Sequence, residues 1–185
     1  LIHLLLRLSI IIVSYNVYPF LDNCLRSVRQ ALQHIDGEII VVDNASVDGT
    51  AQQVRQHFPD VRLIANQDNR GFARANNQGI VAATGEFILL LNPDTIVSED
   101  TFSTCIQFME QHPDAGAIGV KMLDGSGRFL PESKRGLPTL SASFMKMTGL
   151  YRLFPRSAKW NHYYEGQIGE NETAKIEVLC GAFMF

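Results

Sequence analysis

The sequence predicts an α/β fold in which a mainly parallel central sheet carries helices on both faces. Strand patterns alternate with helical patterns over residues 9–120, which is typical of βα units. Three of the strand patterns end in a polar cluster, as expected at the carboxyl edge of a parallel sheet. A length of 185 residues favours one domain with a sizeable core over two domains.

Apolar, β-branched runs predict the strands, and apolar residues at helical spacing predict the helices. Strands are expected at 9–15, 38–42, 61–65, 87–91 and 115–120, and helices at 18–35, 47–58, 71–83 and 98–112. The sequence Asp124-Gly125-Ser126-Gly127 predicts a hairpin turn. Residues 131–170 lose the alternation and contain three prolines, so we expect a mobile or substrate-facing segment there rather than a second domain.

The composition is that of an ordinary globular protein, with 46% hydrophobic and 19% charged residues. Sixteen basic and nineteen acidic residues give a net charge of −3, which argues against a nucleic-acid partner. The three cysteines, Cys24, Cys105 and Cys180, lack metal-ligand spacing and are interpreted as free buried thiols in a reducing compartment. None of the five histidines is assigned a functional role.

Residues 1–8 are apolar but too few to span a bilayer. They have no basic region ahead of the apolar run and no small-residue cleavage site after it, which argues against a signal peptide. We interpret them as an extension or a cloning remnant. A membrane-surface role is the alternative, weakened by the presence of a single basic residue.

The polar clusters at the strand ends are the first candidate site. They are Ser14-Tyr15-Asn16, Asp43-Asn44-Ala45-Ser46 and Asn92-Pro93-Asp94. Ligands of open α/β sheets bind outside the carboxyl ends of the strands, so these clusters are expected to converge. The carboxylate of Asp43 can accept hydrogen bonds from a nucleobase or a ribose. Asp94 can bind a divalent cation together with the oxygens of a diphosphate.

A fourth cluster, residues 69–77, opens the third expected helix. The N-terminus of a helix attracts anions, small residues allow close approach of a nucleotide, and Arg74 can pair with phosphate.

Each cluster also has a structural interpretation. Asp43, Asn44 and Ser46 could cap the next helix, Asp94 could be a turn residue, and Asn69 with Gly71 could be a loop that leads into a helix.

Two other nucleotide-binding folds are disfavoured by the residues that follow the first strand. The sequence Ser14-Tyr15-Asn16-Val17-Tyr18 contains no glycine. It therefore lacks the fingerprint of a dinucleotide-binding Rossmann domain. A nucleotidyltransferase would need a glycine-rich, basic loop for its triphosphate at the same place.

Five stretches together resemble a family 2 glycosyltransferase. They are IIIVSYN (10–16), VVDNASVDGT (41–50), NRGFARANNQGI (69–80), GEFILLLNPDT (85–95) and CGAFMF (180–185). The motif Asn92-Pro93-Asp94-Thr95 and the sequence of residues 133–139 are similar to the corresponding sequences of the rhamnosyltransferase-like branch of this family. The resemblance implies a GT-A fold in a single domain over residues 9–185. Residues 9–120 would form its donor nucleotide-binding half, and residues 121–185 the start of its acceptor-binding half.

The resemblance also implies roles for individual residues. Ser14, Tyr15 and Asn16 would border the nucleotide, and Asp43 would bind the base beside Asn44. The nucleoside and diphosphate pocket would be lined by Asn69, Gly71, Arg74 and Asn76. Asp94 would ligate Mg²⁺ or Mn²⁺ next to Asn92, which stands where the family more often has an aspartate. Arg135 would contact the diphosphate or the acceptor.

The catalytic residue is not identified within this sequence. The family's general base belongs to a glutamate–aspartate pair downstream of the GAFMF-like strand, so we expect it beyond Phe185 in a longer chain, of which this is a C-terminally truncated part. Glu99-Asp100 matches that pair in residue type but stands directly after Asn92-Pro93-Asp94, where the family has no base.

The resemblance implies an inverting, metal-dependent glycosyltransferase. It would move a sugar from a dTDP- or UDP-sugar, with dTDP-rhamnose as one candidate, to a polysaccharide or lipid-linked acceptor in cell-surface glycan synthesis. A cytoplasmic location is expected, including peripheral association with the inner face of the membrane. The alternative is a catalytically silent nucleotide-sugar binding module. The donor sugar, the linkage and the oligomeric state stay open.

Overall fold

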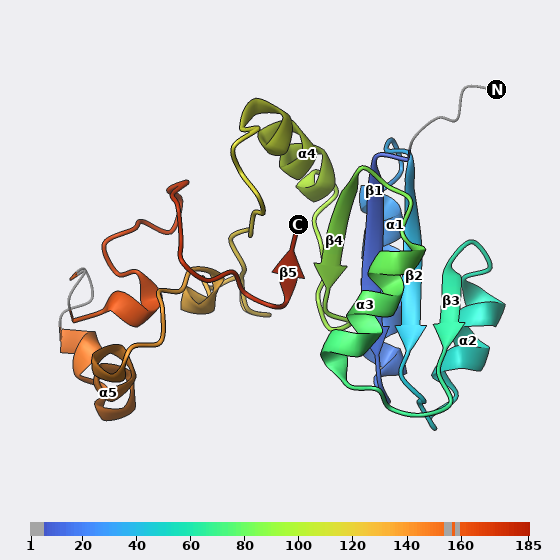
Figure 1. Ribbon diagram of the computed structural model, residues 1–185, viewed down its shortest axis with the longest axis horizontal. Helices are drawn as coiled ribbons and strands as arrows, with labels where there is room; N and C mark the ends of the chain where they lie inside the picture. Colours follow the sequence, from blue (N-terminus) through green and yellow to red (C-terminus); the bar gives the residue numbers. More distant parts are fainter. Residues whose placement is uncertain (1–5, 154–156, 158–159) are drawn as a thin grey trace. The chain divides into compact units, whose positions relative to one another are not determined.

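The computed structural model describes residues 6–153, 157 and 160–185 (Figure 1). The chain divides into two compact units. The first comprises the residues up to Ala117 together with Gly181–Phe185, and the second comprises Ile118–Cys180. The expected extension at residues 1–8 lies mostly outside the described residues.

The first unit contains a five-stranded sheet in the order β3-β2-β1-β4-β5. Its strands are β1 (Leu8–Ser14), β2 (Gly37–Asp43), β3 (Arg62–Ala65), β4 (Phe87–Leu91) and β5 (Phe183–Met184). The first four strands are parallel, and β5 pairs antiparallel with β4. The prediction of an α/β fold with a mainly parallel sheet is confirmed. The carboxyl ends of β1, β2 and β4 therefore lie at one edge.

Helices cover both faces of this sheet. The helices of the first unit are α1 (Tyr18–Ala31), α2 (Thr50–His57), α3 (Phe72–Ala82) and α4 (Thr101–Gln111). Figure 1 shows α3 in front of the sheet and α1 behind it. The consecutive helices α1 and α2 contact each other, whereas α3, which follows β3, contacts β1 and β2 from the other face (Figure 1).

The core follows from the alternation of side chains along the strands. Ile11, Val13, Ile40 and Val42 pack with Ala75 of α3 on one face. The residues between them, such as Ile10 and Ile12, are fully buried on the other face, where α1 buries its own apolar stripe. β1 is buried along its whole length, as expected of a central parallel strand.

Three expectations about the elements need correction. Residues 115–120 form no strand, and the short strand β5, which the sequence analysis did not predict, pairs with β4. The apolar run over residues 87–91 predicts a strand buried on both faces, but β4 is only partly buried at Phe87, Ile88 and Leu90. Finally, α4 begins at Thr101, so Glu99 and Asp100 precede its first turn.

The second unit has little regular structure. The expected hairpin turn is present: Asp124 N–H donates to the carbonyl of Arg128, and Leu123 pairs antiparallel with Phe129. The other elements are the short 3-10 helices η1 (Pro131–Ser133), η2 (Leu150–Leu153) and η3 (His162–Tyr164) and the helix α5 (Leu140–Thr148). Arg135 pairs with Val178, which ties the start of this irregular segment to its end.

All three cysteines are free thiols. Cys24 and Cys105 are buried as predicted, and burial raises the pKa of each to about 12, with the charge of Asp94 adding to the effect at Cys24. Cys180 is only partly buried, so the expectation of a buried thiol is wrong there. Within the described residues, no helix has both the length and the apolar character that crossing a bilayer requires.

Close packing at the start of β4 gives a stability prediction. A Cβ at Gly85 would lie 2.6 Å from the backbone nitrogen of Ser9 and 2.7 Å from the carbonyl carbon of Leu8, and backbone atoms of a central strand cannot move aside. Gly85→Ala should therefore lower the free energy of unfolding by about 2–3 kcal/mol in urea denaturation. Gly116→Ala is the control, because nothing lies within 4 Å of its Cβ position. Equal stability of the two variants would contradict this packing.

Candidate functional site

A cleft of about 550 Å³ lies at the carboxyl ends of β1 and β4 in the first unit. Six of the predicted site residues line it: Tyr15, Asn44, Asn69, Gly71, Asn92 and Asp94. The cleft walls also include five residues to which the sequence analysis gave no individual role: Val13, Val17, Phe20, Phe72 and Pro93. Residues that are far apart in the sequence thus converge at this sheet edge, as the strand-end clusters predicted.

The loops after β1 and β2 are locked to each other. Ser46 Oγ accepts from Asn16 N–H at 2.9 Å, and Asn16 Oδ1 accepts from Val47 N–H at 2.8 Å. Asn16 and Ala45 both have positive φ angles, of 55° and 68°, which are uncommon for non-glycine residues and gather at functional loops. Asn16 therefore holds the two loops together and is not part of the cleft wall; a contact with the nucleotide stays a prediction.

Asn44 connects β2 to the loop before α3. It is buried, its Nδ2 donates to Asn69 Oδ1 at 2.7 Å, and its Oδ1 accepts from Arg70 N–H at 3.0 Å and from Asn66 Nδ2 at 3.2 Å. Because Asn69 Oδ1 also accepts from Gly71 N–H at 2.9 Å, the entry to α3 is positioned by this one amide.

Asn44→Ala should lower the free energy of unfolding by about 2–3 kcal/mol, since it leaves several polar groups without partners. Urea denaturation measures this. Asn77→Ala is the matched control, because Asn77 is an exposed amide on α3. A loss no larger than that of Asn77→Ala would show that Asn44 does not organise the loop.

Two buried polar atoms at the strand ends have no hydrogen-bond partner within the described part of the chain. They are Ser14 Oγ and Asp43 Oδ1. Ser14 and Asp43 are partners in the register of β1 and β2, so both atoms lie at the same level of the sheet edge. The other oxygen of Asp43 accepts from Ser46 N–H at 3.3 Å. Buried groups without partners are costly, and a ligand that donates hydrogen bonds would relieve this cost.

The capping interpretation does not account for these side chains. α2 begins at Thr50, and the carboxylate that binds its first turn is that of Asp48, whose Oδ1 accepts from Thr50 N–H at 3.1 Å. Asp43 binds within its own loop, and Asn44 binds the loop before α3. The capping interpretation is therefore wrong for Asp43 and Asn44, and nucleotide contacts by these two residues stay predictions.

The turn after β4 brings Asp94 into the cleft wall. The turn is fixed on two sides, since Asn92 N–H donates to the carbonyl of Ala182 at 3.0 Å and Val97 N–H donates to Ser27 Oγ of α1 at 3.2 Å. Among the described residues that line the cleft, Asp94 is the one carboxylate. Magnesium sites often combine one or two carboxylates with substrate phosphates, so this donor set fits a cation that arrives with a diphosphate.

The start of α3 forms another part of the cleft wall. Gly71 is its N-cap with a φ of 77°, and Phe72 follows it in the wall. The N-terminus of this eleven-residue helix can attract negative charge. Arg74 is exposed and does not line the cleft, while Asn76 is buried and donates to the carbonyl of Phe72 at 3.0 Å. Nucleotide contacts by Arg74 and Asn76 stay predictions.

Aromatic side chains were the main feature missed from the sequence. Tyr15, Phe20 and Phe72 all line the cleft and are about half exposed. Of these, only Tyr15 was predicted as a site residue. Phe72 stands inside the predicted cluster of residues 69–77, which was the available signal. Helical spacing predicts Phe20 as part of the apolar stripe of the first helix, but the structure leaves it exposed. Exposed aromatic rings can stack on a base or a sugar.

A comparison with known protein families identifies the family of this chain. The model described as "Glycosyl transferase family 2" matches residues 9–182. The chain belongs to glycosyl transferase family 2. An N-acetylglucosaminyl-diphospho-decaprenol L-rhamnosyltransferase of Mycobacterium tuberculosis is 28% identical over 187 residues, which cover 95% of this chain and 59% of the relative. The rhamnosyltransferase-like resemblance is therefore confirmed.

Solved structures agree with the family assignment. The mannosyltransferase PcManGT from Pyrobaculum calidifontis, in complex with GDP-Man and Mn²⁺, matches with a TM-score of 0.56 and 29% identity over 62% of this chain and 35% of that chain. The TarS protein of Staphylococcus aureus matches with a TM-score of 0.59 and 26% identity over 69% of this chain and 24% of that chain. The fold of this family 2 chain is GT-A. The chain spans 59% or less of the length of these relatives.

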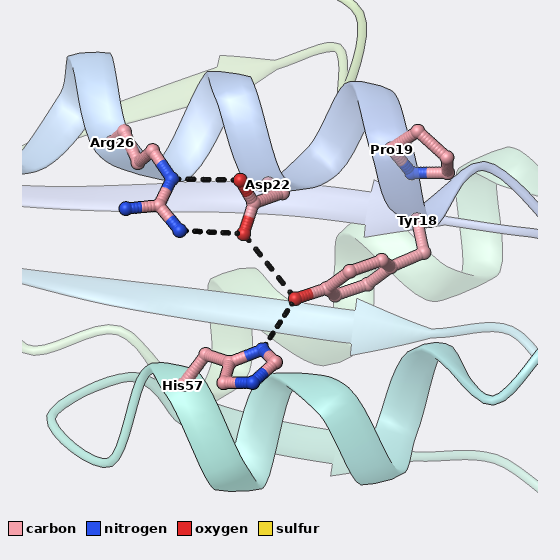
Figure 2. A pocket seen from close by; sticks show the side chains of 5 residues that line it. All are labelled: Tyr18, Pro19, Asp22, Arg26 and His57. Carbon is pink, nitrogen blue, oxygen red and sulfur yellow. Dashed lines mark hydrogen bonds and ion pairs between the residues drawn. The ribbon is translucent and has the colours of Figure 1, made fainter.

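A second pocket in the first unit lies apart from the sheet-edge cleft. It is lined by Tyr18, Pro19, Asp22, Arg26 and His57 of α1 and α2 (Figure 2). The Tyr18 hydroxyl contacts His57 Nδ1 at 2.8 Å and donates to Asp22 at 3.2 Å, and Asp22 accepts from Arg26 at 2.7 Å. The hydrogen bond from Arg26 holds the pKa of Asp22 below its usual value. This network joins α1 to α2, so His57 is engaged in packing between the two helices.

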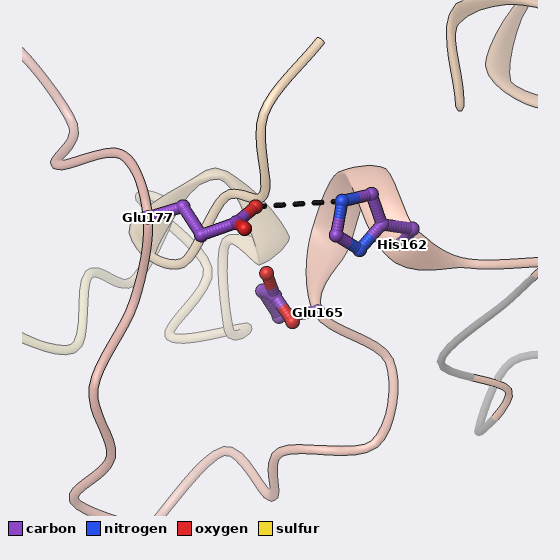
Figure 3. A group of neighbouring side chains, drawn as sticks. All are labelled: His162, Glu165 and Glu177. Carbon is purple, nitrogen blue, oxygen red and sulfur yellow. Dashed lines mark ion pairs between the residues drawn. The ribbon is translucent and has the colours of Figure 1, made fainter. Parts of the chain in front are cut away.

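His162, Glu165 and Glu177 gather in the second unit (Figure 3). Their ligand atoms lie within 4.8 Å of one another, an arrangement that the sequence did not predict. His162 pairs with Glu177 at 3.4 Å, and Glu177 also accepts from Leu137 N–H at 2.7 Å. These bonds join three separate segments, which gives the cluster a structural explanation. Arg135 belongs to this unit, and its Nε is buried without a partner within the described residues.

Proposed function

We propose that this chain is the donor-binding portion of an inverting glycosyltransferase. The observation that carries the proposal is the cleft at the ends of β1 and β4, where Asp94 shares the walls with Asn44 and Tyr15. Next to it, Ser14 and Asp43 hold buried polar atoms without partners. Such a site suits a ligand with a nucleoside at one end and a diphosphate at the other.

Each wall of the cleft is assigned one part of the donor. Asp43 and Ser14 accept hydrogen bonds from the nucleoside, and Tyr15 borders the base. The loop held by Asn44, with Asn69, Gly71 and the start of α3, faces the ribose and the diphosphate. Arg74 adds positive charge nearby. The assignments follow the hydrogen-bonding capacity of each group.

Asp94 would hold a divalent cation, Mg²⁺ or Mn²⁺, with Asn92 beside it as a weaker, neutral ligand. When bound, such an ion neutralises the negative charge that develops on the leaving diphosphate. The relative PcManGT was solved with GDP-Man and Mn²⁺, which supports the assignment.

The donor is proposed to be a dTDP- or UDP-sugar, with dTDP-rhamnose as the first candidate. The name of the mycobacterial relative supports rhamnose as the sugar and a lipid-linked saccharide as the acceptor. We propose a cytoplasmic enzyme of cell-surface glycan synthesis. Residues 9–120 would form the donor half and 121–185 the start of the acceptor half, to which Arg135 belongs.

The general base is assigned to residues that follow Phe185. A direct displacement needs a carboxylate that takes the proton of the acceptor hydroxyl. Within the described residues, neither Glu99 nor Asp100 lines the cleft, and Glu99 accepts a hydrogen bond from Gln30 of α1. The second candidate function, a catalytically silent binding module, shares the same donor site but lacks the base.

Calorimetric titration with UDP, dTDP and GDP, each with and without Mn²⁺, tests the proposed donor site. Tighter binding of UDP or dTDP in the presence of Mn²⁺ is expected. Lack of binding by all three nucleotides would contradict the proposal. Turnover by a chain extended beyond Phe185 then separates the enzyme from the binding module, since the module would stay inactive with every donor.

A further inference from the structure

Three side chains of the kinds that bind metal ions meet in the second unit. His162 begins η3, Glu165 directly follows η3, and Glu177 comes from the last part of the unit. Each offers one ligand atom, and these atoms lie within 4.8 Å of one another (Figure 3). One imidazole nitrogen and two carboxylate oxygens are a donor set that suits Zn²⁺.

The ion pair between His162 and Glu177 does not account for Glu165. Glu165 is only 5% exposed, and its Oε2 accepts a hydrogen bond from Gln167. No lysine or arginine among the described residues forms an ion pair with its carboxylate. Lys134 Nζ lies nearby but donates to the main-chain carbonyls of Glu165 and Ile168. A buried carboxylate is costly without a positive charge beside it, so this group calls for a cation.

The carboxylate of Glu165 faces the other two members of the cluster. Figure 3 shows it turned toward the pair formed by His162 and Glu177. Its Oε1 accepts no hydrogen bond from the described residues, and it lies beside Gly136. A Cβ at Gly136 would be 2.8 Å from this oxygen and 3.1 Å from Cε1 of His162. The glycine therefore leaves open a space that any other residue would fill.

The separation of His162 and Glu177 is that of two ligands of one ion. Nε2 of His162 lies 3.4 Å from a carboxylate oxygen of Glu177. A charge-assisted hydrogen bond is usually shorter, at about 2.7–2.9 Å. A tetrahedral Zn²⁺ with nitrogen and oxygen ligands at about 2.0–2.2 Å holds two of them about 3.3–3.5 Å apart. The third ligand atom would need to approach by at most about 1.5 Å to reach the same spacing.

Both carboxylates are held in place from outside the cluster. Glu177 accepts from Leu137 N–H at 2.7 Å, and Glu165 accepts from Gln167. Carboxylates that bind metal ions are usually oriented by hydrogen bonds of this kind, which fix the ligand before the ion arrives. The cluster thus has ligands and also the outer contacts that position them.

We propose that His162, Glu165 and Glu177 bind one Zn²⁺ ion that stabilises the second unit. With three protein ligands, the fourth position would be taken by water. The unit has about 60 residues and little regular structure, and domains below about 70–80 residues often need a metal ion to supplement a small core. Sites of this kind bind Zn²⁺ more tightly than Mn²⁺, the ion proposed for the donor cleft. The inference goes beyond the donor site and does not depend on it.

Calorimetric titration of the EDTA-treated chain with Zn²⁺ tests the site. One ion should bind per chain, and His162→Gln or Glu177→Gln should each weaken this binding at least about 100-fold. Glu170→Gln and His34→Gln are the matched controls, because both residues are exposed and lie outside the cluster, and they should leave it unchanged. Asp94→Ala should also leave it unchanged, which separates this site from the donor cleft. Circular dichroism without metal confirms that the variants fold.

The single tryptophan provides a second measurement, which needs no variant. Trp160 stands two residues before His162, so Co²⁺ bound at the cluster should quench its emission with the stoichiometry of one ion, and Zn²⁺ should reverse the quenching. Zn²⁺ at 100 times its Kd should also raise the folding equilibrium constant of the second unit about 100-fold, measured by Trp160 emission in urea.

Three results would overturn the proposal. The first is absence of Zn²⁺ binding by the unmodified chain, which would leave the cluster as an ion pair alone. The second is undiminished binding by both ligand variants. The third is an equal loss in Glu170→Gln, which would assign the binding to the general acidity of the chain. If a ligand variant fails to fold, the quenching by Co²⁺ and the stabilisation by Zn²⁺ decide, and absence of both contradicts the site.

Discussion

Asp94→Ala should lower the Mn²⁺-dependent affinity for UDP or dTDP by about 100-fold, because the cleft would lose the carboxylate that holds the cation. In an extended, active enzyme the same change should lower kcat by about 10²–10³-fold, as expected when one stabiliser of the leaving group is removed. Calorimetry with and without Mn²⁺ measures the first effect, and a donor-consumption assay measures the second.

Two controls separate this effect from others. Asp100→Ala removes an exposed carboxylate that makes no capping bond to α4 and should change neither quantity. His162→Gln tests whether the cluster of His162, Glu165 and Glu177 contributes to Mn²⁺ binding, and it should leave the nucleotide affinity unchanged. If Asp94→Ala binds the nucleotide with the same Mn²⁺-dependent affinity as the unmodified chain, the proposed role of Asp94 as a metal ligand is contradicted.

Asp43→Asn should weaken binding of UDP or dTDP by about 10- to 100-fold. The buried Oδ1 of Asp43 has no partner among the described residues, and a charged acceptor at this place suits the N–H of a pyrimidine base. An amide can keep the bond from Ser46 N–H through its oxygen, but it turns an N–H donor toward the donor of the base. Calorimetry with each nucleotide measures the loss.

Pyrophosphate distinguishes the two aspartates. It carries the diphosphate but no base, so Asp43→Asn should leave its Mn²⁺-dependent binding unchanged, whereas Asp94→Ala should abolish it. Equal losses of pyrophosphate affinity in both variants would mean that Asp43 shapes the whole cleft rather than binding the base.

The sheet could be predicted from the sequence because its signals are local. The short, β-branched apolar run Ile10–Val13 is typical of a central parallel strand, and the polar residues that follow such a strand are expected at the edge of the sheet. The convergence of Asn44, Asn92 and Asp94 on one cleft followed from topology alone, since parallel strands bring their carboxyl ends together.

Other features depend on contacts between distant residues. A strand was expected at residues 115–120, but the fifth strand of the sheet is β5, and local pattern does not decide which short segment pairs with β4. The roles of Asn16 and Asn44 as connectors between loops depend on side-chain bonds to residues 22 to 31 positions away, and Asn16 also has a positive φ angle. Similarly, His162 meets Glu177 only because the irregular second unit folds back on itself.

A crystal structure grown with UDP or dTDP and Mn²⁺ tests the central claim most directly. The nucleotide should lie in the cleft bordered by Tyr15, Asn44 and Asp94, with its base at Asp43 and the ion on Asp94. A nucleotide found instead in the pocket of Tyr18 and His57, or an ion bound away from Asp94, would contradict the account.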